Sequence, residues 1–292
     1  MKPKPECVLC TVKWVFERLT AGLEADDKTN FQLLRKILGI LGDKFTQDTS
    51  PAKAANIVLE HLKEAIELSR PYFEVIKAQS NEIAKQLLPQ LEEALEKTKD
   101  EVERLERKLL VATLSNVAPI GKPDKSFDFY DVKTYLQGSP VPLTASADLK
   151  TKISKAKSIL YILDNAGEVG FDSLVIEELK NNNKKIYLVC KKDYFFDDAT
   201  LNDIEYFAID KLVDDIIISN GIFLPEEADP PSKDLLKNVD LIISKGTGNY
   251  EALKDDFTHK DIIFALKIKC ERVGNYYKMP VGSYVIDRCN AI

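Results

Sequence analysis

The sequence predicts an α/β protein in which an all-α helical bundle precedes a Rossmann-like, three-layer αβα sandwich with a mostly parallel sheet. Apolar residues recur at helical spacing up to about residue 113, and short β-branched apolar runs separated by helical segments follow after about residue 150. A chain of 292 residues, 45% of them hydrophobic, is long enough for two domains with real cores. We expect the bundle over residues 1–115, a connecting region over 116–150, and the Rossmann-like domain over 151–292.

Amphipathic helices account for the first third of the chain. Two apolar stripes predict the first helices, over residues 12–19 and 31–41. A third helix is expected to begin at Pro51, because Ser50 can cap the free amides and proline suits the first helical position, and to end near Pro71. Apolar residues from 91 to 109, on a background of Glu and Lys, predict one long helix with a solvated face.

Five short apolar runs predict the buried strands of a parallel sheet. They cover residues 158–163, 185–190, 215–219, 239–244 and 261–266. Residues 171–179 and 201–207 lie between runs and have helical spacing, so the repeated unit is a strand followed by a helix. Ligands of an open parallel sheet bind beyond the carboxyl ends of the strands. The residues that follow each run are therefore the first candidates for a site.

Charge and composition exclude several classes of protein. The formal net charge of -6 does not favour binding to nucleic acid or to anionic membranes. No apolar run approaches the roughly 20 residues that span a bilayer, and the first ten residues lack the apolar core of a secretory signal. Five cysteines, an odd number, fit a reducing compartment. We expect a soluble, cytoplasmic protein.

Oxygen-bearing side chains follow the first two predicted strands. The first strand is followed by Asp164, Asn165 and Glu168, and the second by an acidic pair that ends in Asp198. Such oxygen ligands suit a hard divalent cation, and loops after neighbouring strands could share one ion. An Asp-Asn pair after a strand is also a frequent turn, so the pattern gains weight only with the other strand ends.

Lysines and glycines follow the last two predicted strands. Lys245, Gly246 and Gly248 come after one of them, where small residues allow backbone amides to approach an anion. Lys267 and Lys269 follow the other and alternate, so only one of the two must face the site. A cation bound by carboxylates and faced by lysines is suited to phosphoryl transfer. By itself, the glycine segment could be an ordinary turn.

The cysteines near the amino terminus form a separate motif. Cys7 and Cys10 have CxxC spacing at the expected start of a helix, which would lower a thiol pKa. They could form a redox pair or half of a second metal site, which Cys270 or Cys289 could complete, or they could be structural thiols.

In order along the chain, four segments resemble the signatures of the damage-control phosphatase family, formerly domain of unknown function 89. The segments are residues 163–168, 197–200, 245–251 and 269–270, and the cysteine-bearing prokaryotic branch is the most similar. The resemblance implies a helical amino-terminal part, a Rossmann-like domain, and metal-dependent phosphatase activity on small phosphorylated metabolites such as sugar phosphates.

The resemblance also implies roles for individual residues. The metal ligands would be Asp164, Asn165 and Asp198, holding one divalent cation (Mg²⁺, Mn²⁺, Co²⁺ or Ni²⁺). The catalytic residues would be Asp164, Glu168 and Lys269, and the substrate-binding residues Asn116, Lys245, Gly246, Gly248, Asn249 and Glu251. The family usually has an acidic residue near the position of Asn116, which this chain lacks.

Several alternatives stay open at this point. Either Asp164 or a metal-bound water could attack the phosphorus. A Rossmann-like sheet also permits an S-adenosylmethionine-dependent carboxyl methyltransferase, an activity also proposed for this family. A third possibility is a protein that binds a phosphorylated metabolite without catalysis. A homo-oligomer is compatible with all three.

Overall fold

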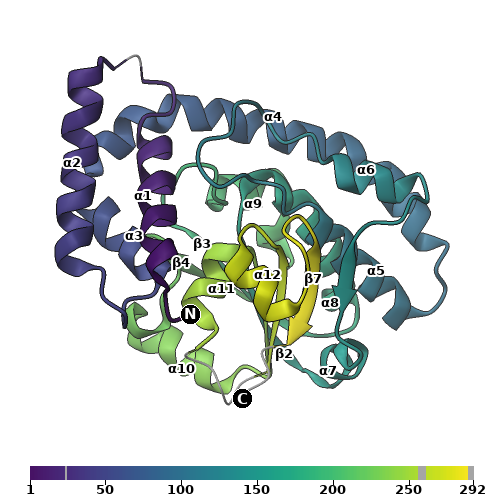
Figure 1. Cartoon of the computed structure of the whole chain (residues 1–292). Helices are drawn as coiled ribbons and strands as arrows, with labels where there is room; N and C mark the ends of the chain where they lie inside the picture. Colours follow the sequence, from purple (N-terminus) through teal and green to yellow (C-terminus); the bar gives the residue numbers. More distant parts are fainter. Residues whose placement is uncertain (24, 256–260, 289–292) are drawn as a thin grey trace.

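Twelve α-helices surround one sheet in the residues that the structure, a computed structural model, describes: 1–23, 25–255 and 261–288 (Figure 1). The helices are α1 (Pro5–Leu19), α2 (Asp27–Lys44), α3 (Pro51–Glu60), α4 (Lys63–Glu96), α5 (Glu101–Leu114), α6 (Tyr130–Leu136), α7 (Leu149–Lys155), α8 (Val169–Asn181), α9 (Leu201–Tyr206), α10 (Pro230–Asn238), α11 (Thr247–Leu253) and α12 (Glu271–Tyr277).

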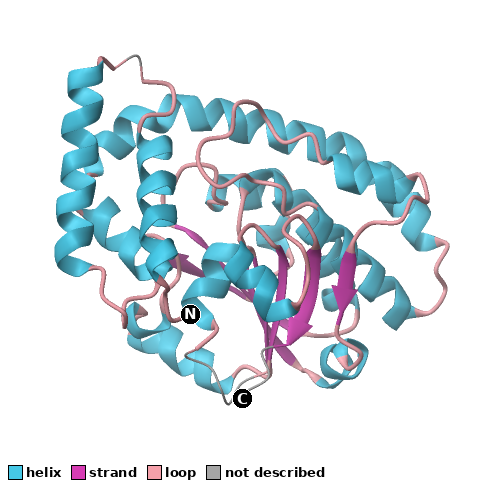
Figure 2. Ribbon diagram, viewed as in Figure 1, coloured by secondary structure: helices cyan, strands magenta, loops and turns pink. Residues whose placement is uncertain are grey.

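Within the described ranges the sheet has seven strands in the order β1-β7-β6-β5-β2-β3-β4. Figure 2 shows the strands, in magenta, with helices around them. The strands are β1 (Leu143–Ala145), β2 (Ser158–Ile162), β3 (Lys185–Lys191), β4 (Asp215–Ser219), β5 (Leu241–Lys245), β6 (Ile262–Lys267) and β7 (Tyr284–Arg288). All pairs are parallel except β6 with β7, which are antiparallel. The five predicted strands are thus confirmed. Strands β1 and β7, which lie side by side at one end of the sheet, were not predicted, and β1 has only three residues, too few to show an alternating pattern.

Helices cover both faces of the sheet, which confirms the predicted three-layer sandwich. Successive residues of β2 point to opposite sides: Ile159 and Tyr161 belong to one apolar core, and Leu160 and Ile162 to the other. The first core is built with α4, α5 and α8, and the second with α10, α11 and α12. Because β2 is buried on both faces, its sequence is a continuous apolar run rather than an alternating one.

The third helix does not end at Pro71, as predicted. Helix α3 ends at Glu60, and α4 begins at Lys63 and continues through Pro71 and a second proline to Glu96. A proline inside a helix costs about 3 kcal/mol, because it lacks an amide hydrogen and crowds the preceding turn. The fully buried Phe73, in the turn after Pro71, is one of the packing contacts that offset this cost.

The predicted single helix from residue 91 to 109 is also wrong, because two helices share this segment. Helix α4 ends at Glu96, and α5 begins at Glu101 after Asp100, whose carboxylate accepts a hydrogen bond from the amide of Glu103 at 2.8 Å. An aspartate that caps an amide in this way starts a new helix. The apolar spacing continues across the break because both helices pack on the same core.

Helices α1, α2 and α3 lie together at one side of the molecule, and the long helix α4 runs from them across to the far side (Figure 1). Their apolar residues form a third core, which also includes Phe195 and Phe196 from the loop after β3. The predicted division at residues 115 and 150 stays a prediction. Among the described residues, no helix combines the length and the apolar composition needed to cross a lipid bilayer.

Replacement of the capping aspartate tests the break between α4 and α5. Asp100→Ala removes the cap, so we expect the free energy of unfolding in urea to fall by about 1 kcal/mol. Lys99→Ala, just before the cap, is the control and should have little effect. An unchanged urea midpoint in Asp100→Ala would instead indicate a continuous helix, in which alanine is the better helix former.

Candidate functional site

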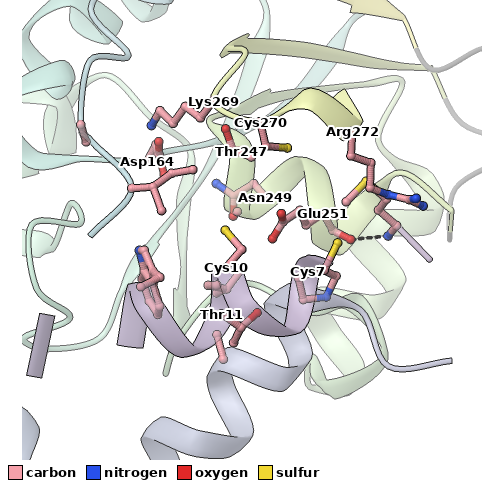
Figure 3. A pocket seen from close by; sticks show the side chains of 18 of the residues that line it. Cys7, Cys10, Thr11, Asp164, Thr247, Asn249, Glu251, Lys269, Cys270 and Arg272 are labelled. Atoms are coloured by element: carbon pink, nitrogen blue, oxygen red, sulfur yellow. Dashed lines mark hydrogen bonds between the residues drawn. The ribbon is translucent and has the colours of Figure 1, made fainter. Parts of the chain in front are cut away.

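A cavity of about 390 Å³ lies beyond the carboxyl ends of the central strands. The chain runs from β2 to β3 and β4 in one direction and then returns to the other side of β2 with β5 and β6. Open α/β sheets bind ligands at such a reversal of strand order. One face of α1, which includes Cys7, Cys10, Thr11 and Trp14, forms the opposite wall of the cavity (Figure 3). The helical region therefore covers the site at the carboxyl ends of the strands.

Backbone hydrogen bonds join the loops that follow β2 and β3. The amide of Ala199 donates to the carbonyl of Asp164 at 2.8 Å, and Asn165 and Asp198 form an antiparallel bridge. Asp164, Asn165 and Asp198 all line the cavity. The structure thus brings together the three predicted metal ligands. Their role as ligands stays a prediction.

Two asparagine amides hold the carboxylates of Asp164 and Glu168 side by side. Nδ2 of Asn116 donates to Oδ2 of Asp164 at 2.7 Å and to Oε1 of Glu168 at 2.9 Å. Nδ2 of Asn165 donates to the same two oxygens, at 2.9 and 2.6 Å. Since each NH₂ group has only two hydrogens, both amides are fully used as donors. Asp164 Oδ1 and Asn165 Oδ1 are the oxygens left for a ligand.

Negative charge accumulates around Asp198. Burial raises the pKa of Asp198 to about 7, and the charges of Asp164 and Asp197 add to this effect, while Lys191 opposes it. Lys191 Nζ lies 3.3 Å from Asp198 Oδ2, and the buried Arg18 forms an ion pair with Asp197. Burial also raises the pKa of Glu168 to about 7. Neighbouring carboxylates contribute to both shifts, and a bound cation would offset their repulsion.

Gly246 allows Asp164 to approach the backbone after β5. Its φ is +80°, and a Cβ atom there would lie 1.9 Å from Asp164 Oδ2, so only glycine fits. Its amide donates to the carbonyl of Ala265 at 3.0 Å and does not face a ligand. A Cβ atom at Gly248 would meet only Ile222, at an ordinary 3.6 Å. Of the two predicted substrate-binding glycines, only Gly248 lines the cavity.

Three other predicted substrate-binding residues lie behind the cavity wall or help to build it. Lys245 is fully buried, with its ammonium between Glu168 and Asp172. Asn116 is fully buried beneath Asp164, and its Oδ1 accepts the amide of Lys267 at 3.0 Å. Asn249, which lines the cavity, donates to the carbonyl of Leu163, just after β2, and to that of Lys245, the last residue of β5, both at 2.9 Å. These placements support structural roles rather than direct substrate contact.

Lys269 and Glu251 line the cavity as predicted. Figure 3 shows the Lys269 side chain at the same end of the cavity as Asp164. The neighbouring Lys267 turns away to Asp131 and Tyr284, at 3.1 and 2.9 Å, so only one of the two lysines faces the site. Burial raises the pKa of Glu251 to about 7. Its carboxyl group lies near Cys10 (Figure 3).

The cysteine motif lines the outer part of the cavity. Cys7, Cys10 and Cys270 are unpaired thiols there, near Glu251 (Figure 3). Burial, followed by the charge of Glu251, raises the pKa of Cys10 to about 11, which is the opposite of the predicted lowering. In the described part of the chain, no three His, Cys, Asp or Glu side chains are placed to hold a metal, and Cys289 lies outside that part. The second metal site stays a prediction without support from the geometry.

Two charged residues of the site were missed in the sequence. Arg18 lies between Val15 and Leu19 on the buried stripe of α1, and an arginine on an apolar stripe is a signal that could have been used. Lys191 ends β3 and is buried beside Asp198. Both line the cavity and place positive charge next to the acidic loop after β3.

The fold and the site define an α/β protein with a cavity at the switch point of its sheet, where Asp164, Asn165 and Asp198 meet. A family model described as the damage-control phosphatase ARMT1-like domain matches residues 4–285, and the chain belongs to this family. The predicted resemblance is therefore confirmed.

Relatives align over nearly the whole chain. An uncharacterized protein of Methanocaldococcus jannaschii is 32% identical over 98% of this chain and 95% of its own. A protein of Archaeoglobus fulgidus named damage-control phosphatase is 30% identical over 98% of both chains. The crystal structure of a DUF89 family protein from Pyrococcus horikoshii superposes with a TM-score of 0.78 at 24% identity, covering 99% of this chain and 100% of that one. This last likeness supports the fold.

The two glycines after β5 give opposite predictions. We expect Gly246→Ala to lower the free energy of unfolding by about 2 kcal/mol or more, because alanine is strained at this φ and its Cβ would displace Asp164. Gly248→Ala, inside α11, should leave stability unchanged or raise it by about 0.5–1 kcal/mol. Urea unfolding of both variants provides the measurement. Equal stability of the two proteins would contradict the close approach of Asp164.

Proposed function

We propose that this protein is a metal-dependent phosphatase that hydrolyses small phosphorylated metabolites such as sugar phosphates. The observation that carries the proposal is the convergence of Asp164, Asn165 and Asp198 on one end of a cavity that Lys269 also lines. The relative from Archaeoglobus fulgidus is named damage-control phosphatase, which supports a phosphatase role in general.

The residues present fit a hard divalent cation. Asp164 Oδ1 and Asn165 Oδ1 are left free by the amide hydrogen bonds described above, and Asp198 adds a second carboxylate. Carboxylate and amide oxygens are the ligands that Mg²⁺ and Mn²⁺ prefer. When bound, such an ion polarises a phosphoryl oxygen and neutralises its charge. The chain's carboxylates would otherwise repel a phosphate, so the proposed activity requires the ion.

The chain's own residues would orient and balance the phosphate. Lys269, from the loop after β6, offers an ammonium at the same end of the cavity, and Lys191 offers another beside Asp198. Positive groups at these positions stabilise the charge of the transferring phosphoryl group. Asp164 has one free oxygen, Oδ1. Either this oxygen attacks the phosphorus, or it binds the cation and a water attacks instead. Both routes require Asp164 to be ionised.

The shape of the cavity supports a small substrate. Its volume of about 390 Å³ is at the lower end of the range for small-molecule sites. Trp14 and Phe195 form part of an apolar side wall, and the α1 helix shields the acidic end from solvent. A shielded site strengthens every charge interaction inside it.

Substitution of Asp164 tests the proposal. We expect Asp164→Asn to reduce metal-dependent phosphate release by about a thousandfold or more, because it removes the charge that the cation and the nucleophile both need. The measurement is phosphate release from para-nitrophenyl phosphate and a panel of sugar phosphates, with Mg²⁺, Mn²⁺, Co²⁺ or Ni²⁺. Asp214→Asn is the control and should keep full activity, because Asp214 lies just before β4, where its carboxylate accepts the amide of Ile186 at the amino end of β3.

Other outcomes of the same assay would favour the alternatives. Full activity of Asp164→Asn, or activity that survives EDTA, would contradict the proposal. Binding of S-adenosylmethionine without metal, measured by calorimetry, would favour the methyltransferase. Tight binding of one phosphorylated metabolite without turnover across the panel would favour a non-catalytic binding protein.

The raised pKa of Asp198 predicts a specific pH dependence. Between pH 4 and pH 7 the folded, metal-free protein binds more protons at Asp198 than the unfolded chain does, because the pKa rises from 3.8 to about 7 on folding. The contribution of Asp198 to the free energy of unfolding should therefore fall as pH rises through this interval. Saturating Mn²⁺ should add stabilisation that grows over the same interval.

Urea unfolding at several pH values, with and without Mn²⁺, provides the measurement. In Asp198→Asn, the fall in the free energy of unfolding with rising pH, measured without metal, should be smaller than in the unmodified protein. The stabilisation by Mn²⁺ should also be smaller. Stabilisation by Mn²⁺ that is equally large at pH 4 and pH 7 would contradict this prediction.

A further inference from the structure

Three side chains form a buried polar group behind the acidic end of the cavity. They are Tyr161 on β2, Asp172 on α8 and Lys245 on β5, and none of the three has measurable exposure to solvent. Lys245 Nζ lies 2.8 Å from Asp172 Oδ1, and the Tyr161 hydroxyl donates to the same oxygen at 2.6 Å. None of them lines the cavity. They cannot touch a substrate directly, yet burying a charge is costly unless it is paired.

The group is linked to the candidate metal ligands through Glu168. Lys245 Nζ is 3.0 Å from Oε2 of Glu168, and the other oxygen, Oε1, accepts the amides of Asn116 and Asn165. Both oxygens of Glu168 are thus held by donors. Because the NH₂ group of Asn165 is held by Glu168 and Asp164, its oxygen is the atom left to face a cation.

Charge balance explains why a second carboxylate is present. With Glu168 alone, the ammonium of Lys245 would form a neutral pair. Asp172 makes the buried group net negative and draws the ammonium to a position between two carboxylates, at 2.8 and 3.0 Å. The extra negative charge lies directly behind Asp164, where it increases the attraction for a cation. It also leaves Glu168 available as an acceptor for both amides.

We propose that Asp172, acting through Lys245 and supported by Tyr161, is a positioning residue for the cation site. It holds the ammonium that fixes Glu168, and Glu168 in turn fixes the amides that orient Asp164 and Asn165. This inference rests on the proposed function, since it assumes that Asp164, Asn165 and Asp198 bind a divalent cation.

Asp172→Asn is a close test because it changes charge and little else. Oδ1 of the new amide can still accept from Tyr161 and Lys245. Oδ2 of Asp172 is buried without a hydrogen-bond partner among the described residues, so an NH₂ group in its place breaks no existing bond. Residues that orient metal ligands typically contribute 10–100-fold to metal affinity. We therefore expect Asp172→Asn to weaken Mn²⁺ binding by about 10–100-fold.

Glu178→Gln on the same helix is the matched control. Glu178 is also buried and paired, with Arg104 at 2.7 Å and Lys108 at 2.8 Å on α5, but it has no contact with the site. We expect Glu178→Gln to lower the free energy of unfolding. The Mn²⁺ dissociation constant should change by less than about twofold, because Glu178 lies outside the network that holds the candidate ligands. Tyr161→Phe keeps the charge of Asp172 and removes one hydrogen bond to it. The loss of Mn²⁺ affinity in Tyr161→Phe should therefore be smaller than in Asp172→Asn and larger than in Glu178→Gln.

The measurement is the Mn²⁺ dissociation constant of each protein. Each is prepared without metal and titrated with Mn²⁺, and the electron paramagnetic resonance signal gives the concentration of free Mn²⁺. Urea unfolding without metal measures the stability of the same proteins. Unchanged affinity in Asp172→Asn, or equal weakening in Glu178→Gln, would overturn this inference alone. Absence of Mn²⁺ binding by the unmodified protein would overturn the proposed function and this inference with it. Should Asp172→Asn not fold, unchanged affinity in Tyr161→Phe would overturn the inference.

Discussion

The site depends on two carboxylates, Asp164 and Glu168, that share the amide hydrogens of Asn116 and Asn165. Like charges this close are unfavourable unless donors and cations compensate them. Four N–H···O bonds from the two amides and the ammonium of Lys245 provide this compensation from behind. In front, the free oxygens are on the side of the cavity, which the side chain of Lys269 also lines. A divalent ion on that side would complete the balance of charge.

The fold brings these groups together from distant parts of the sequence. Asn116 follows α5, Asp164 and Asn165 follow β2, and Lys245 ends β5, which is the neighbour of β2 on the other side from β3. Gly246 then permits the close packing of Asp164 against the backbone. The helical region contributes the opposite wall through α1, so the cavity exists only where the bundle covers the carboxyl ends of the strands. The position of the site at the switch point thus follows from the order of the strands.

Much of this arrangement could be predicted from the sequence, because strand ends are local signals. Apolar runs were enough to predict the strands. The rule that parallel sheets bind ligands at the carboxyl ends of their strands was enough to single out the acidic residues after β2 and β3. The direction in which a side chain points, by contrast, could be determined only from the three-dimensional structure. Lys245 was expected in the cavity, but the last residue of a strand faces one side only, and its side chain points to the interior.

Other features left no local signal. Asp172 lies in a helix where an acidic residue is usually solvated, and Tyr161 is one of several large residues in a buried strand, so neither could be linked to the site before the fold was known. The continuation of α4 through Pro71 likewise depends on tertiary packing, which outweighs a local preference.

The most direct test of the account is anomalous X-ray diffraction, at the manganese absorption edge, from a crystal of this protein soaked in Mn²⁺. We expect a manganese peak bound by oxygens of Asp164, Asn165 and Asp198, on the side of Asp164 away from Asn116. A map without a peak there, or with a peak only near Cys7 and Cys10, would contradict it.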